Sequence, residues 1–284
     1  MTRVIFAMLL GALLGAATAH AEVPTAADDT PLDALTDAQR ATFHQAEAAW
    51  QDGLLYRAEE LFEGLTREAP DFDRAWRRRC GVVLEQDRAE DARTLCREAL
   101  SLRDSAPNRT GLALALIRLD PRTEDAQEGR PELTEARALI DVVTASAPDY
   151  VSGWHALCAW GAAAESIDAL DTCLLRLADL EPASAGAWYY EAVRALLLDD
   201  HAAAMRALRE SRRLGLSPDL FRPLAFALAE AGVRPGRQGK RRAKAKGWTW
   251  QDAIPWGVGA VLVVSVLLVA FGRRDEPEPG ADRE

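Results

Sequence analysis

The chain has 284 residues, 49% hydrophobic and 27% charged, which is the composition of a globular protein rather than a disordered one. Residues 22–230 carry 23 arginines and 38 acidic side chains, a formal net charge of −15. This charge argues against nucleic-acid binding, because phosphate contacts need clustered basic residues. The four histidines of the whole chain argue against a rich metal site.

Residues 1–21 have the layout of a secretory signal peptide. Arg3 is followed by the apolar run 4–17, and Ala19-His20-Ala21 places small residues at the two positions that a signal peptidase reads. We expect cleavage between Ala21 and Glu22; the alternative is an uncleaved membrane anchor. Residues 22–38 are acidic and contain two prolines, which predicts a flexible lead.

Residues 39–232 form a predicted helical repeat domain. Trp154 and Trp188 are 34 residues apart, each opens an alanine-rich helical stretch, and Trp76 opens a third. If each tryptophan is position 4 of a unit, the units begin at Gln39, Asp73, Pro107, Val151 and Ala185. The third unit is ten residues longer than the others, and its extra residues fall in the polar loop 120–132.

Small residues recur in this register. Position 8 is Ala46, Cys80, Leu114, Cys158 and Ala192. Position 20 is Ala58, Ala92, Ala136, Leu170 and Ala204. Units end at Pro70, Pro148 and Pro182. Two antiparallel helices approach closely only where small side chains face each other, so the pattern indicates stacked helical hairpins.

Over residues 39–218 this pattern resembles the tetratricopeptide repeat (TPR). The resemblance implies an all-α fold, a right-handed superhelical solenoid of about five hairpins, to which residues 219–232 add a capping helix. Leu170 in place of alanine and the missing proline of the second unit depart from the family's pattern. Any other antiparallel helical repeat is the alternative.

The repeat register also pairs the four cysteines. Cys80 and Cys96 lie on the two helices of the second hairpin, and Cys158 and Cys173 on those of the fourth. Each pair lies at similar distances from its turn, and export favours oxidation, so we expect the disulfides Cys80–Cys96 and Cys158–Cys173. The alternative is that cysteine serves only as a small residue at position 8.

The C-terminal part predicts a membrane anchor. Residues 253–272 are almost wholly apolar and, as a helix, would span about 30 Å, the thickness of the bilayer's hydrocarbon core. Tryptophans flank the N-terminal end of this segment and arginines the C-terminal end: Trp248, Trp250, Trp256, Arg273 and Arg274. Residues 273–284 form a short acidic tail.

Residues 233–252 form a basic juxtamembrane linker, with seven lysines or arginines between Arg234 and Lys246. In an exported chain this cluster lies on the periplasmic side, where it would contact anionic lipid headgroups. Basic residues usually mark the cytoplasmic flank instead, so the cluster argues against this orientation.

The sequence lacks the motifs of common enzymes, including HExxH, GxSxG and the Walker glycine loop. The histidines after residue 21 fall in separate units without a nearby nucleophile. We therefore expect no enzyme activity, no cofactor and no metal.

In the TPR family the first helix of each hairpin lines a concave protein-binding groove. The resemblance assigns this groove to Phe43, Trp50, Arg74, Arg77, His155, Tyr189 and Val193. Ordinary repeat packing is the alternative for each of these residues.

The favoured hypothesis is a scaffold that docks another envelope protein or a peptide segment. It is held in the bacterial inner membrane, with the repeats in the periplasm and the C-terminus in the cytoplasm. One alternative is a non-catalytic subunit of a membrane protease or transport complex. Another is a sorted surface protein whose C-terminal helix is a processing signal.

Overall fold

The computed structural model describes residues 30–120 and 130–233, which belong to one compact unit ending at Val233. These residues form one short 3-10 helix and eleven α-helices, without a strand among them. The predicted signal peptide, basic linker, membrane helix and tail lie outside the described residues. Within that part, no helix combines the length and apolar character needed to cross a bilayer.

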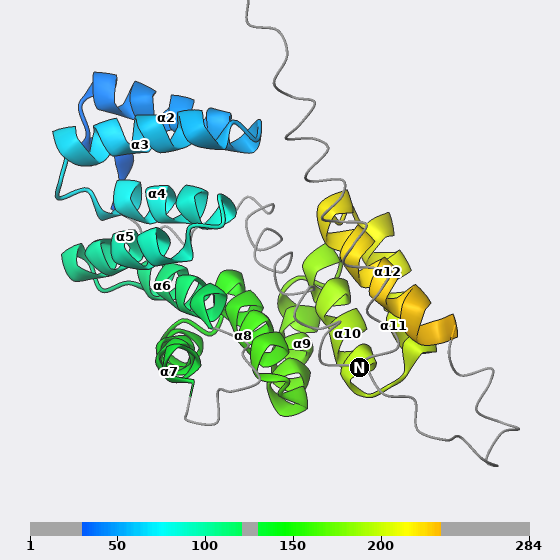
Figure 1. Ribbon diagram of the computed structural model, residues 1–284. Helices are drawn as coiled ribbons and strands as arrows, with labels where there is room; N and C mark the ends of the chain where they lie inside the picture. Colours follow the sequence, from blue (N-terminus) through cyan, green and yellow to red (C-terminus); the bar gives the residue numbers. More distant parts are fainter. Residues whose placement is uncertain (1–29, 121–129, 234–284) are drawn as a thin grey trace, which may run out of the picture. The chain divides into compact units, whose positions relative to one another are not determined.

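The helices pair into five consecutive hairpins and a final helix (Figure 1). After the 3-10 helix η1 (Leu32–Ala34), the first two hairpins are α2 (Asp37–Gln51) with α3 (Leu55–Glu68) and α4 (Asp73–Glu85) with α5 (Ala89–Leu102). The next two are α6 (Ala106–Leu119) with α7 (Pro131–Ser146) and α8 (Val151–Ala164) with α9 (Ile167–Leu180). The last is α10 (Ala185–Leu197) with α11 (His201–Arg213), followed by α12 (Pro218–Val233). The predicted all-α repeat of five hairpins and a capping helix is confirmed.

Local sequence signals set the helix boundaries. Five helices begin at a side chain that accepts a hydrogen bond from a backbone N–H of the first turn: Thr36, Ser105, Ser166, Ser184 and Asp200. At Thr36 the cap is reciprocal, because Gln39 also accepts a hydrogen bond from the Thr36 N–H.

The turn inside a hairpin repeats as well. Four of the five hairpins place a residue with positive φ at position 15, directly between their two helices: Gly53, Asp87, Glu165 and Asp199. A single left-handed residue ends a helix and lets the chain reverse within a few residues. The remaining hairpin, the third, carries the inserted loop between its two helices, α6 and α7.

The recurring tryptophan and proline bind successive units together. The Trp76 indole donates a hydrogen bond of 2.8 Å to the Pro70 carbonyl oxygen, six residues earlier. Trp154 donates an equivalent bond of 2.8 Å to Pro148. The two positions therefore recur because they form one contact across each of these junctions.

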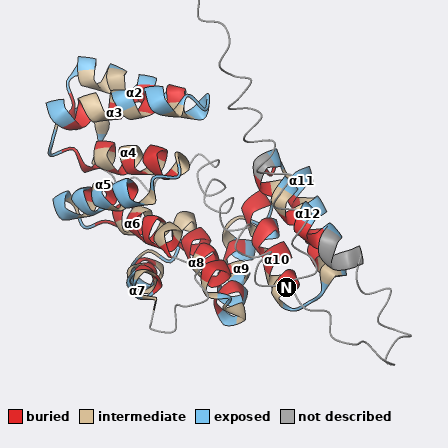
Figure 2. Ribbon diagram, viewed as in Figure 1, coloured by how far each residue is buried: buried red, intermediate tan, exposed pale blue. Residues whose placement is uncertain are grey.

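The small-residue register holds the hairpins together. All five residues at position 20 are completely buried, Leu170 included, and so are Ala46 and Ala192 at position 8. Small side chains let the two helices of one hairpin approach closely. Large side chains fill the groove between successive hairpins. Figure 2 shows the result in α8, whose ribbon is buried along most of its length.

In the third unit the register differs from the prediction by one residue. The helix begins at Ala106 rather than Pro107, because Ser105 caps it. Ala113 is completely buried, whereas Leu114, at the predicted position 8, is only partly buried.

The described end of the predicted flexible lead is ordered. Residues 32–34 form η1, Leu35 packs in the core under the first hairpin, and α2 starts at Asp37, two residues before the predicted boundary. This segment is ordered because the apolar side chain of Leu35 packs into the core. The acidic composition of residues 22–38 did not predict that contact.

Both predicted disulfides are present. Cys80–Cys96 joins α4 to α5 with the Cα atoms 5.4 Å apart, and Cys158–Cys173 joins α8 to α9 at 5.6 Å. All four cysteines are buried. The cysteine at position 8 thus forms a covalent link as well as filling a small site.

Candidate protein-binding site

The first helices of the hairpins form a continuous layer. Within it α4 contacts α6, α6 contacts α8, and α8 contacts α10. All seven predicted groove residues lie on helices of this kind, α2, α4, α8 and α10. Their burial decides which of them a partner can reach.

In the last two hairpins the predicted groove residues belong to the core. Tyr189 and Val193 on α10 are buried, at 0% and 2% exposure, and His155 on α8 is also buried. The ring of Tyr189 packs edge-on against that of Tyr190, with 5.6 Å between their centroids. Burial raises the pKa of both tyrosines far above that of a free phenol. Tyr189, Val193 and His155 therefore pack within the repeat, which is the alternative that the sequence left open for each of them.

A glycine explains why His155 is buried. A Cβ at Gly186 of α10 would lie only 2.9 Å from His155 Cε1, so the imidazole rests directly on the backbone of the next unit. Its Nε2 lies 3.0 Å from Glu181 Oε2 at the end of α9. His155 thus joins the fourth and fifth hairpins.

In the first two hairpins the same layer is more open and carries charge. Arg74 of α4 lies over the ring of Phe43 of α2, with 5.0 Å from its guanidinium carbon to the centroid. Arg78 lies 5.7 Å over Trp50 and pairs with Glu47 at 3.1 Å. We name Glu47, Trp50, Arg74 and Arg78 the arginine–aromatic face.

A glycine also shapes this face. A Cβ at Gly81 would lie 2.6 Å from the Trp50 ring, so α4 approaches the indole as closely as its backbone allows. Trp50, Arg74, Glu47 and Arg78 are all partly exposed, the last two with 21% and 18% of their side-chain surface accessible. Phe43 and Arg77 are buried, as ordinary repeat packing would have them.

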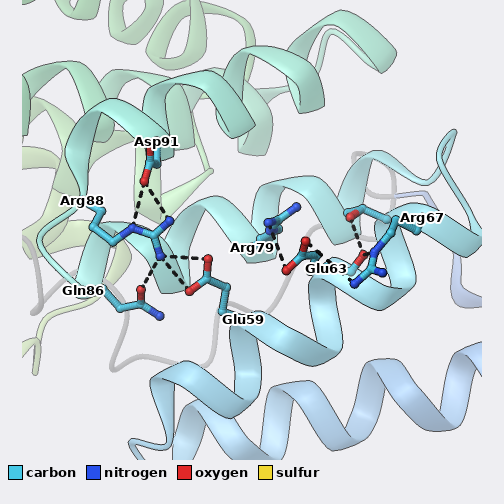
Figure 3. A network of polar contacts seen from close by, with 8 residues as sticks. Glu59, Glu63, Arg67, Arg79, Gln86, Arg88 and Asp91 are labelled. Atoms are coloured by element: carbon cyan, nitrogen blue, oxygen red, sulfur yellow. Dashed lines mark hydrogen bonds and ion pairs between the residues drawn. The ribbon is translucent and has the colours of Figure 1, made fainter.

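A polar network joins the first two hairpins along α3 and the α4–α5 turn (Figure 3). Arg88 Nη1 donates hydrogen bonds of 2.9 Å to both carboxylate oxygens of Glu59, and Arg88 Nε donates to Asp91 at 2.9 Å. These bonds raise the pKa of Arg88, the one to Asp91 most. Farther along α3, Glu63 pairs with Arg79 of α4 at 3.5 Å.

Ion pairs between units recur at later junctions. Arg118 at the end of α6 pairs with the turn residue Asp87 at 2.6 Å, and Arg97 of α5 pairs with Glu135 of α7 at 3.0 Å. Arg194 of α10 pairs with Asp171 of α9. These pairs could not be predicted from charge patterns within one helix, because each partner lies 23–38 residues away.

A buried carboxylate anchors the start of the described chain. Asp73 Oδ2 at the first turn of α4 accepts a hydrogen bond of 2.7 Å from Asn108 of α6, and its Oδ1 accepts one from the Thr30 hydroxyl. Arg103 Nη1, at the end of α5, donates to the same hydroxyl at 3.1 Å. Thr30 therefore lies where the second and third hairpins meet.

The described residues offer no group of three or more His, Cys, Asp or Glu side chains that could hold a metal ion. The arginine–aromatic face instead presents guanidinium donors and aromatic rings, the side chains enriched at protein interfaces. Chemically the face can bind a polypeptide through charge-assisted hydrogen bonds and ring contacts.

Comparison with known proteins shows the fold and no closer relationship. No family model matches the sequence, and no curated protein matches it. Solved TPR structures do match at low identity. A thermophilic TPR protein of Thermus thermophilus has 16% identity and a TM-score of 0.60, with 69% of this chain and 99% of the other covered.

Two further structures agree with this fold. A tetratricopeptide repeat protein of Parabacteroides merdae has 12% identity and a TM-score of 0.57, covering 70% of this chain and 73% of its own. PilW, described as a type IV pilus biogenesis factor, has 16% identity and a TM-score of 0.54, with coverages of 85% and 97%. The chain therefore has a TPR-like fold.

Proposed function

We propose that this chain is a non-enzymatic scaffold that binds another envelope protein or a peptide segment. It is tethered to the bacterial inner membrane by residues 253–272, with the repeats in the periplasm. The arginine–aromatic face carries this proposal, because it is the part of the predicted groove where charged and aromatic side chains remain partly exposed.

Two observations support the periplasmic location. Both cysteine pairs form buried disulfides inside single hairpins, and such bonds persist in oxidising compartments. The sequence also begins with a signal-peptide layout and carries the apolar segment 253–272 after the repeats.

Membrane tethering suits weak binding at this face. A tethered domain meets its partner at a raised effective concentration, so a small contact area suffices. The basic residues 234–246 add an attraction of about 1 kcal/mol each for anionic headgroups close to the surface. The tether and the linker thus hold the repeats near the membrane, where an envelope partner is found.

Charge reversal at the face tests the proposal. Full-length protein in its native host is crosslinked, and the adducts of wild type, Arg78→Glu and Arg57→Glu are compared by mass spectrometry. Arg57 lies on α3, outside the arginine–aromatic face, and provides the matched control. We expect one envelope protein to crosslink to wild type and Arg57→Glu at equal yield and to Arg78→Glu at least about tenfold less.

Equal yields from all three chains, with unchanged melting temperatures, would place the interface elsewhere. Loss from both variants would show that binding follows overall charge rather than this face. Either result contradicts the proposal.

A further inference from the structure

The helix α12 exposes a face that the earlier first helices bury. It packs beside α11, in the place of a sixth first helix (Figure 1). The register that places Ala192 at position 8 and Ala195 at position 11 of the fifth unit places Phe226 and Ala229 there, 34 residues later. Phe226 is 70% exposed, and Ala229 is exposed as well. A helix that only capped the array would present polar side chains at these positions.

In the earlier units these two positions face the second helix of the same hairpin. At position 8, Cys80 and Cys158 are bonded through their disulfides to the second helices α5 and α9. At position 11, a Cβ on Gly161 would lie 3.1 Å from the Leu170 side chain of α9. The residues at position 11 of all five hairpins are buried: Ala49, Val83, Ile117, Gly161 and Ala195. The exposed face of α12 therefore marks the place of a sixth second helix.

The helix α11 places a positive charge beside this place. Earlier in the array an ion pair joins two successive second helices, because Arg97 at position 25 of the second unit lies 3.0 Å from Glu135 at position 19 of the third. Position 25 of the fifth unit is Arg209. Arg209 is exposed, and its Nε donates a hydrogen bond of 3.2 Å to the Met205 carbonyl oxygen of its own helix. By the same register, an acid on a sixth second helix would pair with Arg209.

We propose that Arg209, Phe226 and Ala229, which we name the C-terminal docking face, bind an acidic amphipathic helix of a partner protein. The helix completes a sixth hairpin. It carries an acid directly before an alanine or glycine, as Glu135 precedes Ala136 in α7. The acid pairs with Arg209, and the small residue leaves room for the Phe226 ring. This surface lies on helices other than those of the arginine–aromatic face, and the inference depends neither on that face nor on the membrane tether.

Charge selects this occupant over two others. The chain's own residues 234–246 hold seven lysines or arginines and no acid, so they would bring like charge to Arg209. A second copy would present its own α11, which has four arginines and one acid, to the same helix. Opposed like charges are unfavourable at an interface, whereas an acidic helix meets charge of the opposite sign.

The test is binding of a labelled peptide of residues 130–147, which contains the acid–alanine pair of α7. The full chain is held in phosphatidylcholine nanodiscs, and binding is measured by fluorescence anisotropy. Phe226→Ala and Arg209→Glu are compared with the matched controls Tyr56→Ala and Arg57→Glu, which change exposed residues of α3. We expect saturable binding to wild type, weakened at least about tenfold by each variant of the docking face and less than about twofold by each control.

A charge exchange assigns the contact to Arg209. The peptide with Glu135→Lys should bind wild type at least about tenfold more weakly and should regain most of its affinity for Arg209→Glu. Arg78→Glu should bind the original peptide as wild type does. The crosslinking test of the arginine–aromatic face therefore succeeds or fails separately from this one.

Three results would overturn the proposal. One is the absence of saturable binding, or equal binding by the docking-face variants and their controls. Another is a dimer in sedimentation that Phe226→Ala abolishes, because a second copy would then cover the face. The third is slower amide exchange of α12 in phosphatidylglycerol nanodiscs without peptide, because a bilayer would then cover it.

Discussion

Position 15 of the hairpin shows how one residue controls a turn. Gly53 adopts a φ of 74°, and a Cβ there would meet nothing within 4 Å, so only backbone strain opposes another residue. Asp87, Glu165 and Asp199 accept the same conformation in later units. The repeat therefore specifies a left-handed turn whether or not glycine provides it.

Two alanine substitutions in the first hairpin should have opposite effects. Gly53→Ala should lower the free energy of unfolding by about 1 kcal/mol, because an L-residue is strained in the left-handed region. Gly64 lies inside α3, also with open space around its Cβ position, and Gly64→Ala should raise stability by about 0.5–1 kcal/mol. Chemical denaturation measures both; the same sign for both would contradict the turn geometry.

Glu191 of α10 should make stability depend on pH. Burial raises the pKa of Glu191, more than Arg194 lowers it. Folding thus disfavours the charged form of Glu191. The resulting loss of stability is fully present above the pKa of the folded state and absent below the pKa of the unfolded state. Glu191→Gln should raise the melting temperature at neutral pH, and the gain should shrink as the pH falls through the carboxyl range.

Glu210 provides the opposite control. Its hydrogen bond from Arg213 lowers the pKa of Glu210, so its contribution is favourable above the unfolded pKa and is lost as the pH falls through the folded pKa. Glu210→Gln should lower the melting temperature at neutral pH and have no effect in acid. Melting curves of both variants between neutral pH and about pH 3 check the signs; a gain from Glu210→Gln at neutral pH would contradict them.

The helix pair is the element whose geometry the sequence predicted best. Position 20 could be assigned because its small residues recur at a fixed period and must be buried wherever two helices touch. The start of the third hairpin was predicted one residue too late. Its N-terminal cap, Ser105, precedes the apolar run, so the run alone did not show where the helix begins. Periodicity thus locates helices well, and caps set their ends.

Overpacking one helix pair tests this register. Ala204 at position 20 of the fifth hairpin is completely buried, whereas Ala202 on the same helix is exposed. Ala204→Leu should cost about 1–3 kcal/mol, because leucine does not fit between α10 and α11. Ala202→Leu should change stability by less than about 0.5 kcal/mol. Equal melting curves for both variants would contradict the packing.

The disulfides should stabilise their hairpins independently. Removing Cys80 and Cys96 by substitution to alanine should cost about 3 kcal/mol, as expected for a closed loop of this length. The same holds for Cys158 and Cys173, and the two losses should add within about 0.5 kcal/mol because a whole hairpin separates them. Denaturation of both pair variants and the quadruple variant measures this; a strongly non-additive result would show that the hairpins do not act as separate units.

At the scale of the whole molecule, the fold was more predictable than the candidate site. Repeat spacing gave five hairpins, their order and both disulfides. Burial of the groove residues could not be read from the sequence, because it depends on how closely successive units approach. Two glycines allow successive units to come close: His155 packs against Gly186, and Trp50 packs against Gly81. The sequence alone does not show which side chain will pack against a given glycine.

The contacts between units were hidden for a related reason. Arg88–Glu59, Arg118–Asp87 and Arg194–Asp171 join residues that lie 23–31 positions apart, so charge patterning within one helix says nothing of them. Each is a partly exposed pair whose individual contribution is small, about 1 kcal/mol or less. Together they fix how one unit meets the next, which decides what part of the first-helix layer stays accessible.

The compartment and the membrane tether are the central claim of the proposed function. The most direct measurement is the intact mass of the protein from its native host, after free thiols are blocked without reductant. We predict a chain that begins at Glu22, ends at Glu284 and carries no blocked cysteine. A chain that retains Met1 and carries four blocked cysteines would contradict it, because the repeats would then face the cytoplasm.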